Sequence, residues 1–600
     1  MNAPNCNVPP VSPIPPTGRM FSFFYRRLGV LLFVGALLPV AVFAQDPDTT
    51  EQQLPDIAPR EFEIRGQLQV SFPALERQPL QGFASPPSVP SVPADHTPYL
   101  GTYKQDLAEL PESLPEPDAV SASFERPEAA RTGFVEFGGG RYTSRFAEAH
   151  LSLPVSTDQT VSLDGNYNGM AGFSPYPSPS SGIETPSDDA DGRIQFESRH
   201  DAVTVRAAAH AAGSAYTLYG EPLIAQRSDP EVPDRSGLSG GLEAAVQTRG
   251  SVRSRVDAAV SRAAYDTDLG TTSETFREQR LALDGRLSVP LGATSAHLDL
   301  SAARSTYGGD VPDGSGFGID GGFAATLIDT DAVRVRGGGR ILTFEAPATP
   351  QRPRPGTVEA NFIVPQARAE LALTPSTTLF GENRPGLDHR GLESLYQRNP
   401  YAEHAPSVQP TLFTTDAASG VRVSTGPLNL SAEAGYRYAP NYQFFSRPTS
   451  TPGTLADPGL AVQYGSARIL HGGVEMALQG RSPIEASLRL SVRDGELVGP
   501  EAPIPYFSPV VAEGMFSVSF ADQKGLVQTT GTIESPRPVD VSGTPEVDTY
   551  VSFDVEASYE ITTLLSAVLE LRNVGPAAPE RWARYARPPA VVSGGFQIHW

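Results

Sequence analysis

The chain has 600 residues and carries 68 acidic against 46 basic side chains, for a formal net charge of −22. This balance argues against strong nucleic-acid binding, because phosphate recognition needs a basic face. No run beyond residue 44 contains the ~20 consecutive apolar residues of a membrane helix. A mature chain that crosses a bilayer must therefore cross it as closed β-sheet, in which the backbone polar groups are paired.

Residues 1–44 are expected to be a signal peptide. The Arg26-Arg27 pair gives a positive segment, residues 28–40 form an apolar segment too short to span as a helix, and small residues precede the expected cleavage site. Met20 is an alternative start, and a membrane anchor is the alternative interpretation. The single cysteine, Cys6, lies in this segment, so we expect no disulfide or thiol chemistry in the mature chain.

Residues 45–130 differ in composition from the rest of the chain, because 14 of these 86 residues are proline. Proline-rich chain is extended and packs poorly. Only residues 61–70 show a pattern that could pair as a strand. We expect a mostly irregular periplasmic extension here, followed by a β-barrel domain over residues 131–600.

From Gly133 onward, segments of alternating apolar and polar residues recur to the end of the chain. In residues 551–561 every odd position is apolar and every even position is polar. A strand turns alternate side chains to opposite faces, and this length suits a tilted membrane strand of about 9–11 residues. The same alternation is found in residues 252–261, 428–437 and 484–493. It predicts strands with lipid on one face and a polar lumen on the other.

The polar faces of these segments would line the lumen. We expect their charged side chains to be solvated and mutually paired, and to tune selectivity for solutes. Examples are Arg253, Arg255, Glu485, Arg489, Arg493 and Glu556.

Connection lengths give an independent indication of a barrel, since outer-membrane barrels alternate short periplasmic turns with long external loops. Short links are expected near residues 156–158, 249–250, 291–293, 329–331, 425–427, 480–483 and 522–525. Long loops are expected near residues 170–190, 220–237, 346–357, 384–407, 443–460, 496–508, 534–548 and 575–590. This alternation predicts an all-β fold, a transmembrane antiparallel β-barrel of about 22 strands within a range of roughly 18–24, with both barrel ends on the periplasmic side.

The last nine residues, 592–600, alternate and end in an aromatic residue. Such a terminal strand resembles the signal that the outer-membrane barrel assembly machinery recognises. Its candidate residues are Phe596, Ile598 and Trp600. An ordinary terminal strand is the alternative.

Three patterns make the barrel region resemble the TonB-dependent outer-membrane receptors. They are similar to the first hairpin of that family, to a late strand carrying Gly-Val-Glu, and to the last hairpin. The corresponding residues are 133–142 with 147–154, 466–476, and 569–574 with 580–582. The resemblance covers residues 133–600 and implies a barrel of 22 strands that binds or passes a small solute.

The chain departs from that family ahead of the barrel. The resemblance implies a plug domain of well over a hundred residues and a short motif that binds TonB. Only the 86 proline-rich residues 45–130 stand between the expected cleavage site and the barrel, and neither feature is recognisable there. A barrel without a plug would be an open hole, so residues 45–130, long loops folded inward, or a partner must narrow it.

No catalytic pattern is evident, and we expect no enzyme and no cofactor. The glycine-rich segments 314–316 and 337–339 lie in turn or strand context rather than at a strand-to-helix turn. One predicted long loop carries His389, Glu393, Glu403 and His404. Their spacing matches no standard metal site, so a solvated loop is the alternative to a ligand site.

A second candidate ligand site is aromatic. Tyr442 and Phe444 belong to a cluster at the end of one predicted strand. They would form either a ligand-stacking rim or the aromatic girdle at the membrane interface.

Three functions remain open for a bacterial outer-membrane barrel of this kind. The first is a receptor or transporter, the second a porin-like passive channel, and the third a non-transporting scaffold that docks a periplasmic partner. Expected partners are outer-membrane lipid and the barrel assembly machinery. Coupling to a TonB-type protein is in doubt because the plug is not recognisable.

Overall fold

The computed structural model describes residues 132–600, apart from 176–183, 221–231, 270–271, 293, 311–312, 347–357, 448–458, 480–482 and 576–579. The predicted signal peptide and proline-rich extension lie outside the described residues. In the described part, no helix is long and apolar enough to cross a membrane.

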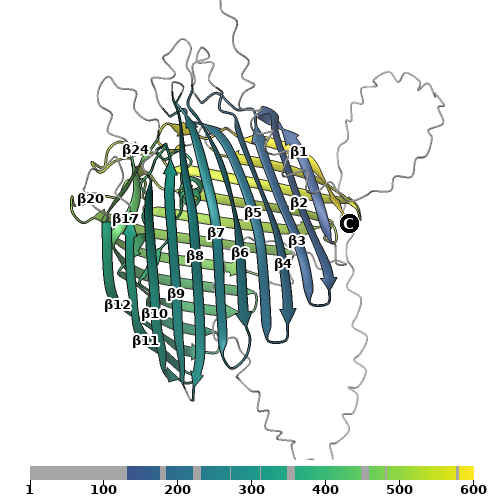
Figure 1. Ribbon diagram of the computed structural model, residues 1–600. Helices are drawn as coiled ribbons and strands as arrows, with labels where there is room; N and C mark the ends of the chain where they lie inside the picture. The colour runs from purple at the N-terminus through teal and green to yellow at the C-terminus, as the bar shows by residue number, and fades with distance from the viewer. Residues whose placement is uncertain are drawn as a thin grey trace, which may run out of the picture. The chain divides into compact units, whose positions relative to one another are not determined.

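Twenty-two antiparallel strands form one closed barrel (Figure 1). Each strand pairs with the next in the chain, and β29 pairs with β1 to complete the ring. The strands are β1 (Gly133–Gly140), β2 (Ser144–Ser156), β3 (Gln159–Met170), β4 (Ser187–His200), β5 (Val203–Thr217), β6 (Asp234–Thr248), β7 (Arg253–Asp268), β8 (Ser273–Leu291), β9 (Thr294–Gly309), β10 (Gly314–Asp329), β11 (Val333–Ala346), β12 (Val358–Thr374), β13 (Thr377–Asn383), β16 (Thr415–Thr425), β17 (Leu428–Ser446), β18 (Ala461–Leu478), β19 (Ile484–Leu497), β21 (Val510–Phe520), β22 (Gly525–Glu534), β25 (Tyr550–Thr562), β26 (Leu565–Val574) and β29 (Val591–His599). The predicted fold class and strand number are confirmed.

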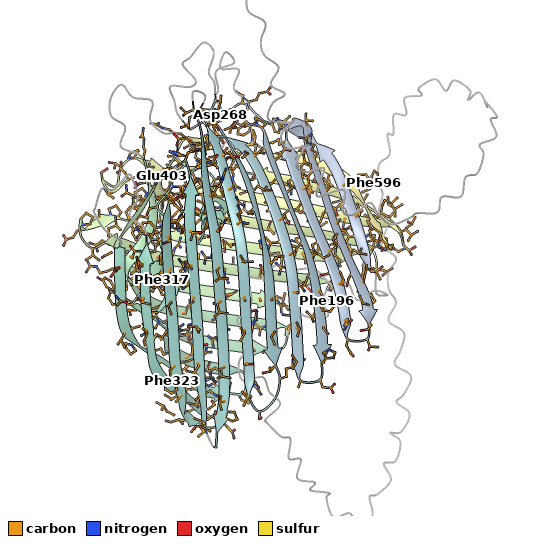
Figure 2. All side chains as sticks on the ribbon, in the orientation of Figure 1. Phe196, Asp268, Phe317, Phe323, Glu403 and Phe596 are labelled. Carbon is orange, nitrogen blue, oxygen red and sulfur yellow. The ribbon has the colours of Figure 1, made fainter. Side chains whose placement is uncertain are left out.

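The alternation of the sequence decides which face of each strand is apolar. On β25, Phe553, Tyr559 and Ile561 are exposed on the outer face, as the pattern of residues 551–561 predicts. Leu281 on β8 is 59% exposed and Ile363 on β12 is 84% exposed. Apolar side chains can remain outside because lipid, rather than water, meets that face of a transmembrane barrel. Figure 2 shows Phe317 and Phe323 at different heights of one strand, β10.

Turns and loops separate to opposite ends of the barrel. All seven predicted short links fall at one end, here called the short-turn end. The predicted long loops fall at the other, the long-loop end. Three connections at the long-loop end are short: β1 to β2 through the 3-10 turn Arg141–Thr143, β7 to β8, and β9 to β10. The predicted strand number is still correct, because each of these short connections joins two consecutive strands at the long-loop end just as a long loop would.

The closing seam lies between the first and last strands. The register runs from Phe134 opposite His599 to Gly140 opposite Ser593. The backbone N–H groups of Thr132 and Gly133 also donate to the carbonyl oxygen of Trp600, at 2.9 and 3.3 Å. In Figure 1 the first strands, in blue, accordingly stand beside the last, in yellow. The start of β1 and the end of β29 therefore both lie at the short-turn end, as an even number of strands requires.

Short elements occupy the loops at the long-loop end. The connection between β13 and β16 contains β14, β15 and the helix α2. These and the remaining short strands are β14 (Gly386–Asp388), α2 (Leu392–Arg398), β15 (Thr411–Phe413), β20 (Ala502–Pro503), β23 (Arg537–Pro538), β24 (Glu546–Val547), β27 (Glu580–Trp582) and β28 (Tyr585–Ala586).

Candidate functional site at the barrel mouth

Residues 384–414, called the mouth loop below, connect β13 to β16 and are described in full. The helix α2 starts after Gly391, whose N–H donates to the side-chain oxygen of Ser394 at 3.1 Å. It ends at Asn399-Pro400, since proline has no N–H and disfavours helical geometry in the residue before it. The sequence therefore builds one short helical turn between two extended segments.

The mouth loop folds toward the lumen. On β6 and β7 the even positions, such as Leu242 and Val256, are exposed on the outer face, so the odd positions face inward. Inward-facing Arg235, completely buried, donates from Nη1 to the carbonyl oxygens of Pro400 (2.9 Å) and Ala402 (2.8 Å). These bonds connect the loop that leaves β13 with β6, seven strands back along the wall.

Polar contacts with β8 and β10 hold the first half of the mouth loop. A carboxylate oxygen of Glu278 accepts from the N–H of Leu392 at 2.6 Å, which satisfies a free donor at the start of α2. Arg280 donates to the carbonyl oxygen of His389 at 3.0 Å. The carboxylate of Asp320 accepts from the N–H of Leu387 at 3.1 Å.

Apolar packing adds to these bonds. Leu392, Leu395 and Tyr396 of α2 are buried at 0%, 0% and 3% exposure. They belong to a cluster that joins inward-facing residues of β7 and β8 to residues of β17 and β18, namely Tyr265, Phe276, Phe445 and Val462. Each fully buried leucine contributes about 1.5–3 kcal/mol relative to an exposed one.

The second half of the mouth loop is held by β18. The backbone N–H of Val462 donates to Glu403 at 3.1 Å. The hydroxyl of Tyr464 donates to the carbonyl oxygen of Ser407 at 3.0 Å and accepts from the N–H of Gln409 at 2.8 Å. The mouth loop is therefore attached to two separated parts of the wall, β6–β10 and β17–β18, and passes between them.

Aromatic contacts tie neighbouring loops to the mouth loop. Tyr401 stacks on Tyr585 of β28 with ring centroids 3.6 Å apart, and Tyr219, after β5, packs edge-on against Tyr585 at 5.1 Å. Trp582 of β27 packs against Phe445 at 5.2 Å. Loops from distant parts of the sequence thus form one packed assembly at the long-loop end.

The four polar candidates of the sequence analysis lie in this loop, each with its own contacts. Glu393 accepts from Ser239 of β6 at 2.7 Å, Glu403 from Val462 of β18, and His404 lies 2.5 Å from Glu274 of β8. Figure 2 places Glu403 at the same end of the barrel as Asp268, the last residue of β7. No group of three or more histidine, cysteine or acidic side chains in the described ranges could hold a metal ion. A role of these residues in ligand binding stays a prediction.

The aromatic candidates lie at the end of β17. Tyr442 packs edge-on against Phe413 of the mouth loop at 6.4 Å. Phe444, 6% exposed, is packed with Ala467, Ile469, Leu497 and Ile504. Stacking of a ligand on Tyr442 or Phe444 likewise stays a prediction.

The sequence analysis did not predict a role for Arg235 and Glu278, although both hold the mouth loop. In the sequence each is one more polar residue at an inward position of an alternating strand. Nothing local distinguishes them from solvated lumen residues, because their partners lie more than a hundred residues away.

His389 gives the mouth loop an expected pH dependence. Burial, together with the nearby guanidinium of Arg280, lowers the pKa of the His389 imidazole, while Asp320, Asp284 and Asp388 act in the opposite sense. The undocked loop would take up a proton at about the ordinary histidine pKa of 6.5, but the docked loop only at a lower pH. Docking should therefore be fully stable above pH 6.5 and weaken as the pH falls through the window below it.

Trypsin cleavage after Arg390 and Arg398 in the purified protein measures this docking. We expect faster cleavage at pH 5.5 than at pH 7.5, after correction for the pH dependence of the protease on an unfolded reference. His389→Gln should reduce the difference, whereas His200→Gln, at an exposed position at the short-turn end, should not. An unchanged difference in His389→Gln would assign the effect to another group.

Part of the lumen lining is paired in the way the sequence analysis expects. Arg255 lies 2.7 Å from Asp257, and Arg489 lies 3.1 Å from Glu475. The segments 314–316 and 337–339 lie on β10 and β11, in the strand context expected for them.

No family model and no curated protein matches this chain. Its fold, however, is similar to solved barrels. The FrpB iron transporter from Neisseria meningitidis superposes with a TM-score of 0.60 at 10% identity, covering 79% of this chain and 82% of that one. The siderophore receptor PirA from Acinetobacter baumannii gives 0.55 at 12% identity, covering 78% and 80%. The ferric-catecholate import receptor Fiu from Escherichia coli K12 gives 0.57 at 11% identity, covering 79% and 82%.

These likenesses show the fold. The residues from Gly133 to Trp600 are 468 of 600, or 78% of the chain, and the covered shares are 78–79%. All three similar structures are named as receptors or transporters, and none as an enzyme.

Proposed function

We propose that this chain is an outer-membrane receptor or transporter for a small solute, whose barrel is closed at the mouth by its own loop rather than by a large plug domain. The observation that carries the proposal is the attachment of residues 384–414 to both β6–β10 and β17–β18. The similar structures, an iron transporter, a siderophore receptor and a ferric-catecholate import receptor, support the transporter class.

The width of the barrel explains why closure matters. Twenty-two strands spaced about 4.8 Å apart and tilted by about 40° enclose a backbone ring roughly 40 Å across. A lumen of that width would leak solutes across the outer membrane. A loop fixed by buried leucines and buried hydrogen bonds can narrow it and can also respond to a ligand.

The proposal includes placement in the membrane. Residues 1–44 would direct export, and residues 45–130 would stay in the periplasm, where they are available to a partner. Phe596, Ile598 and Trp600, which are exposed on the outer face at 48%, 42% and 46%, would present the terminal strand to the assembly machinery. Outer-membrane lipid would then cover that face. Coupling to a TonB-type protein is not part of this proposal.

Planar-bilayer recording on the full chain tests the proposal. We expect small or brief currents from the full chain, and large steady currents when residues 386–412 are replaced by a short Gly-Ser linker. A version without residues 45–130 shows how much the proline-rich extension, as distinct from the mouth loop, reduces the current. Large steady currents from the full chain would instead indicate a passive channel. Absence of current in every version would indicate a scaffold.

A further inference from the structure

The lumen wall beside the closing seam carries acidic side chains in an unusual arrangement. Glu136 of β1 stands directly opposite Glu148 of β2. On the other side of β29, Glu556 of β25 stands directly opposite Glu570 of β26. Like charges facing each other across a strand pair destabilise a sheet. Two such pairs lie within five neighbouring strands, β25, β26, β29, β1 and β2.

These carboxylates face the lumen. Phe137 on β1 and Phe553 on β25 are exposed on the lipid side, at 47% and 39%. Glu136 and Glu556 have the opposite parity on the same strands, so they point inward. Glu148 and Glu556 are open to the lumen, whereas Glu136 is 7% exposed.

Their charge is largely uncompensated. Arg572 pairs with Glu570 at 2.6 Å and also donates to Asn168 at 2.9 Å. Glu136, Glu148 and Glu556 have no hydrogen bond or ion pair in the described part of the chain. Four carboxyl groups on this part of the wall thus share one guanidinium, that of Arg572.

Several acidic side chains elsewhere on the lumen wall are paired with arginine. Asp416 stands opposite Arg437, with an ion pair of 2.8 Å, and Glu475 stands opposite Arg489. Asp257 faces Asp284 across a strand pair but is held by Arg255. A buried carboxylate is costly while it is charged and unpaired, so a positively charged ligand at the seam would stabilise the charged form of Glu136 and complete the site.

The chemistry of the wall indicates the class of that ligand. No three of the described acidic or histidine side chains are grouped so as to hold a metal ion. The carboxylates are instead distributed over five strands, roughly 20 Å of wall at about 4.8 Å per strand. A point ion cannot bridge that width, whereas a flexible molecule with several ammonium groups can.

We propose that the seam wall, defined by Glu136, Glu148, Glu556 and Glu570, binds a linear organic polycation of the polyamine class. The inference rests on the proposed transport function and narrows its substrate class. Each ammonium group would donate to one or two carboxylates, and Glu136 would gain the partner that it lacks. Binding should weaken as salt screens the charges.

Calorimetric titration of the detergent-purified full chain with spermine tests this inference. We expect saturable binding that weakens at least tenfold in the triple variant Glu136→Gln/Glu148→Gln/Glu556→Gln. The matched control Asp257→Asn/Glu370→Gln/Asp416→Asn removes the same number of lumen charges, each from an arginine pair. It should bind spermine as the native protein does.

Two outcomes overturn the inference. The first is equal binding, or no binding, in all three proteins. The second is tight Ca²⁺ binding that is lost in the triple variant, which would make the wall a metal site. The double variant Glu148→Gln/Glu556→Gln, at the exposed positions, replaces the triple if the latter fails to assemble. A protein that reaches the outer membrane and conducts only when its mouth loop is removed, but does not bind spermine, would contradict the polyamine site and leave the proposed transport function standing.

Discussion

Replacing both Leu392 and Leu395 by aspartate is expected to release the mouth loop and open the barrel. The two side chains are completely buried against β7, β8, β17 and β18. Removing their apolar burial costs about 3–6 kcal/mol in total, before any cost of burying charge. The ratio of docked to undocked loop should thus fall by a factor of roughly 10²–10⁴, because each 1.4 kcal/mol is tenfold.

Cells that produce this variant should become sensitive to vancomycin, which an intact outer membrane excludes. Purified variant protein should be cut by trypsin after Arg390 and Arg398 much faster than the native chain. Val541→Asp is the control, because Val541 lies in another loop and is already 44% exposed. If the double variant admits no vancomycin although trypsin cuts the loop, the lumen is closed by another element.

The second large effect is expected at the seam. A Cβ atom added to Gly140 would overlap the carbonyl oxygen of Val592 on the facing strand β29. A backbone atom cannot move aside as a flexible side chain can, so Gly140→Val should prevent β1 from pairing with β29 at the long-loop end. The barrel would then expose unpaired backbone groups to lipid, which is strongly unfavourable.

Folded outer-membrane barrels migrate differently before and after heating in gel electrophoresis, and this shift measures assembly. We expect Gly140→Val to lose most of the heat-sensitive form. Gly321→Val is the matched control, since an added Cβ at Gly321 on β10 meets no atom within 4 Å. Equal assembly of the two variants would show that the seam is not the constraint we infer.

The barrel itself was predictable because its information is local and repeated. Alternation in segments such as residues 551–561 tells lipid face from lumen face one strand at a time. Alternating connection lengths then give the strand number and place both ends of the barrel at the short-turn end. These features agree because a bilayer leaves closed sheet as the only way for non-helical chain to cross it.

The candidate site was predictable only as a location. The sequence placed His389, Glu393, Glu403 and His404 together in one long loop, which is where they are found. Inward-folded long loops were one of three ways considered for narrowing the barrel, but the sequence did not indicate that this loop is the one, or that Arg235 holds it. The contacts responsible join residues 165 and 167 positions apart.

The opposed carboxylates at the seam show the same limit. In the sequence, Glu136 and Glu556 are ordinary polar positions of alternating strands, and the expected lining was a paired one. Each stands opposite another glutamate rather than an arginine because of strand register, and barrel closure brings the two pairs close together by joining the first and last strands. The sequence by itself determined the barrel and the orientation of its faces, because alternation acts within a single strand. Tertiary structure alone decided where the mouth loop is attached and which carboxyl groups face each other at the seam, because both depend on which distant strands become neighbours.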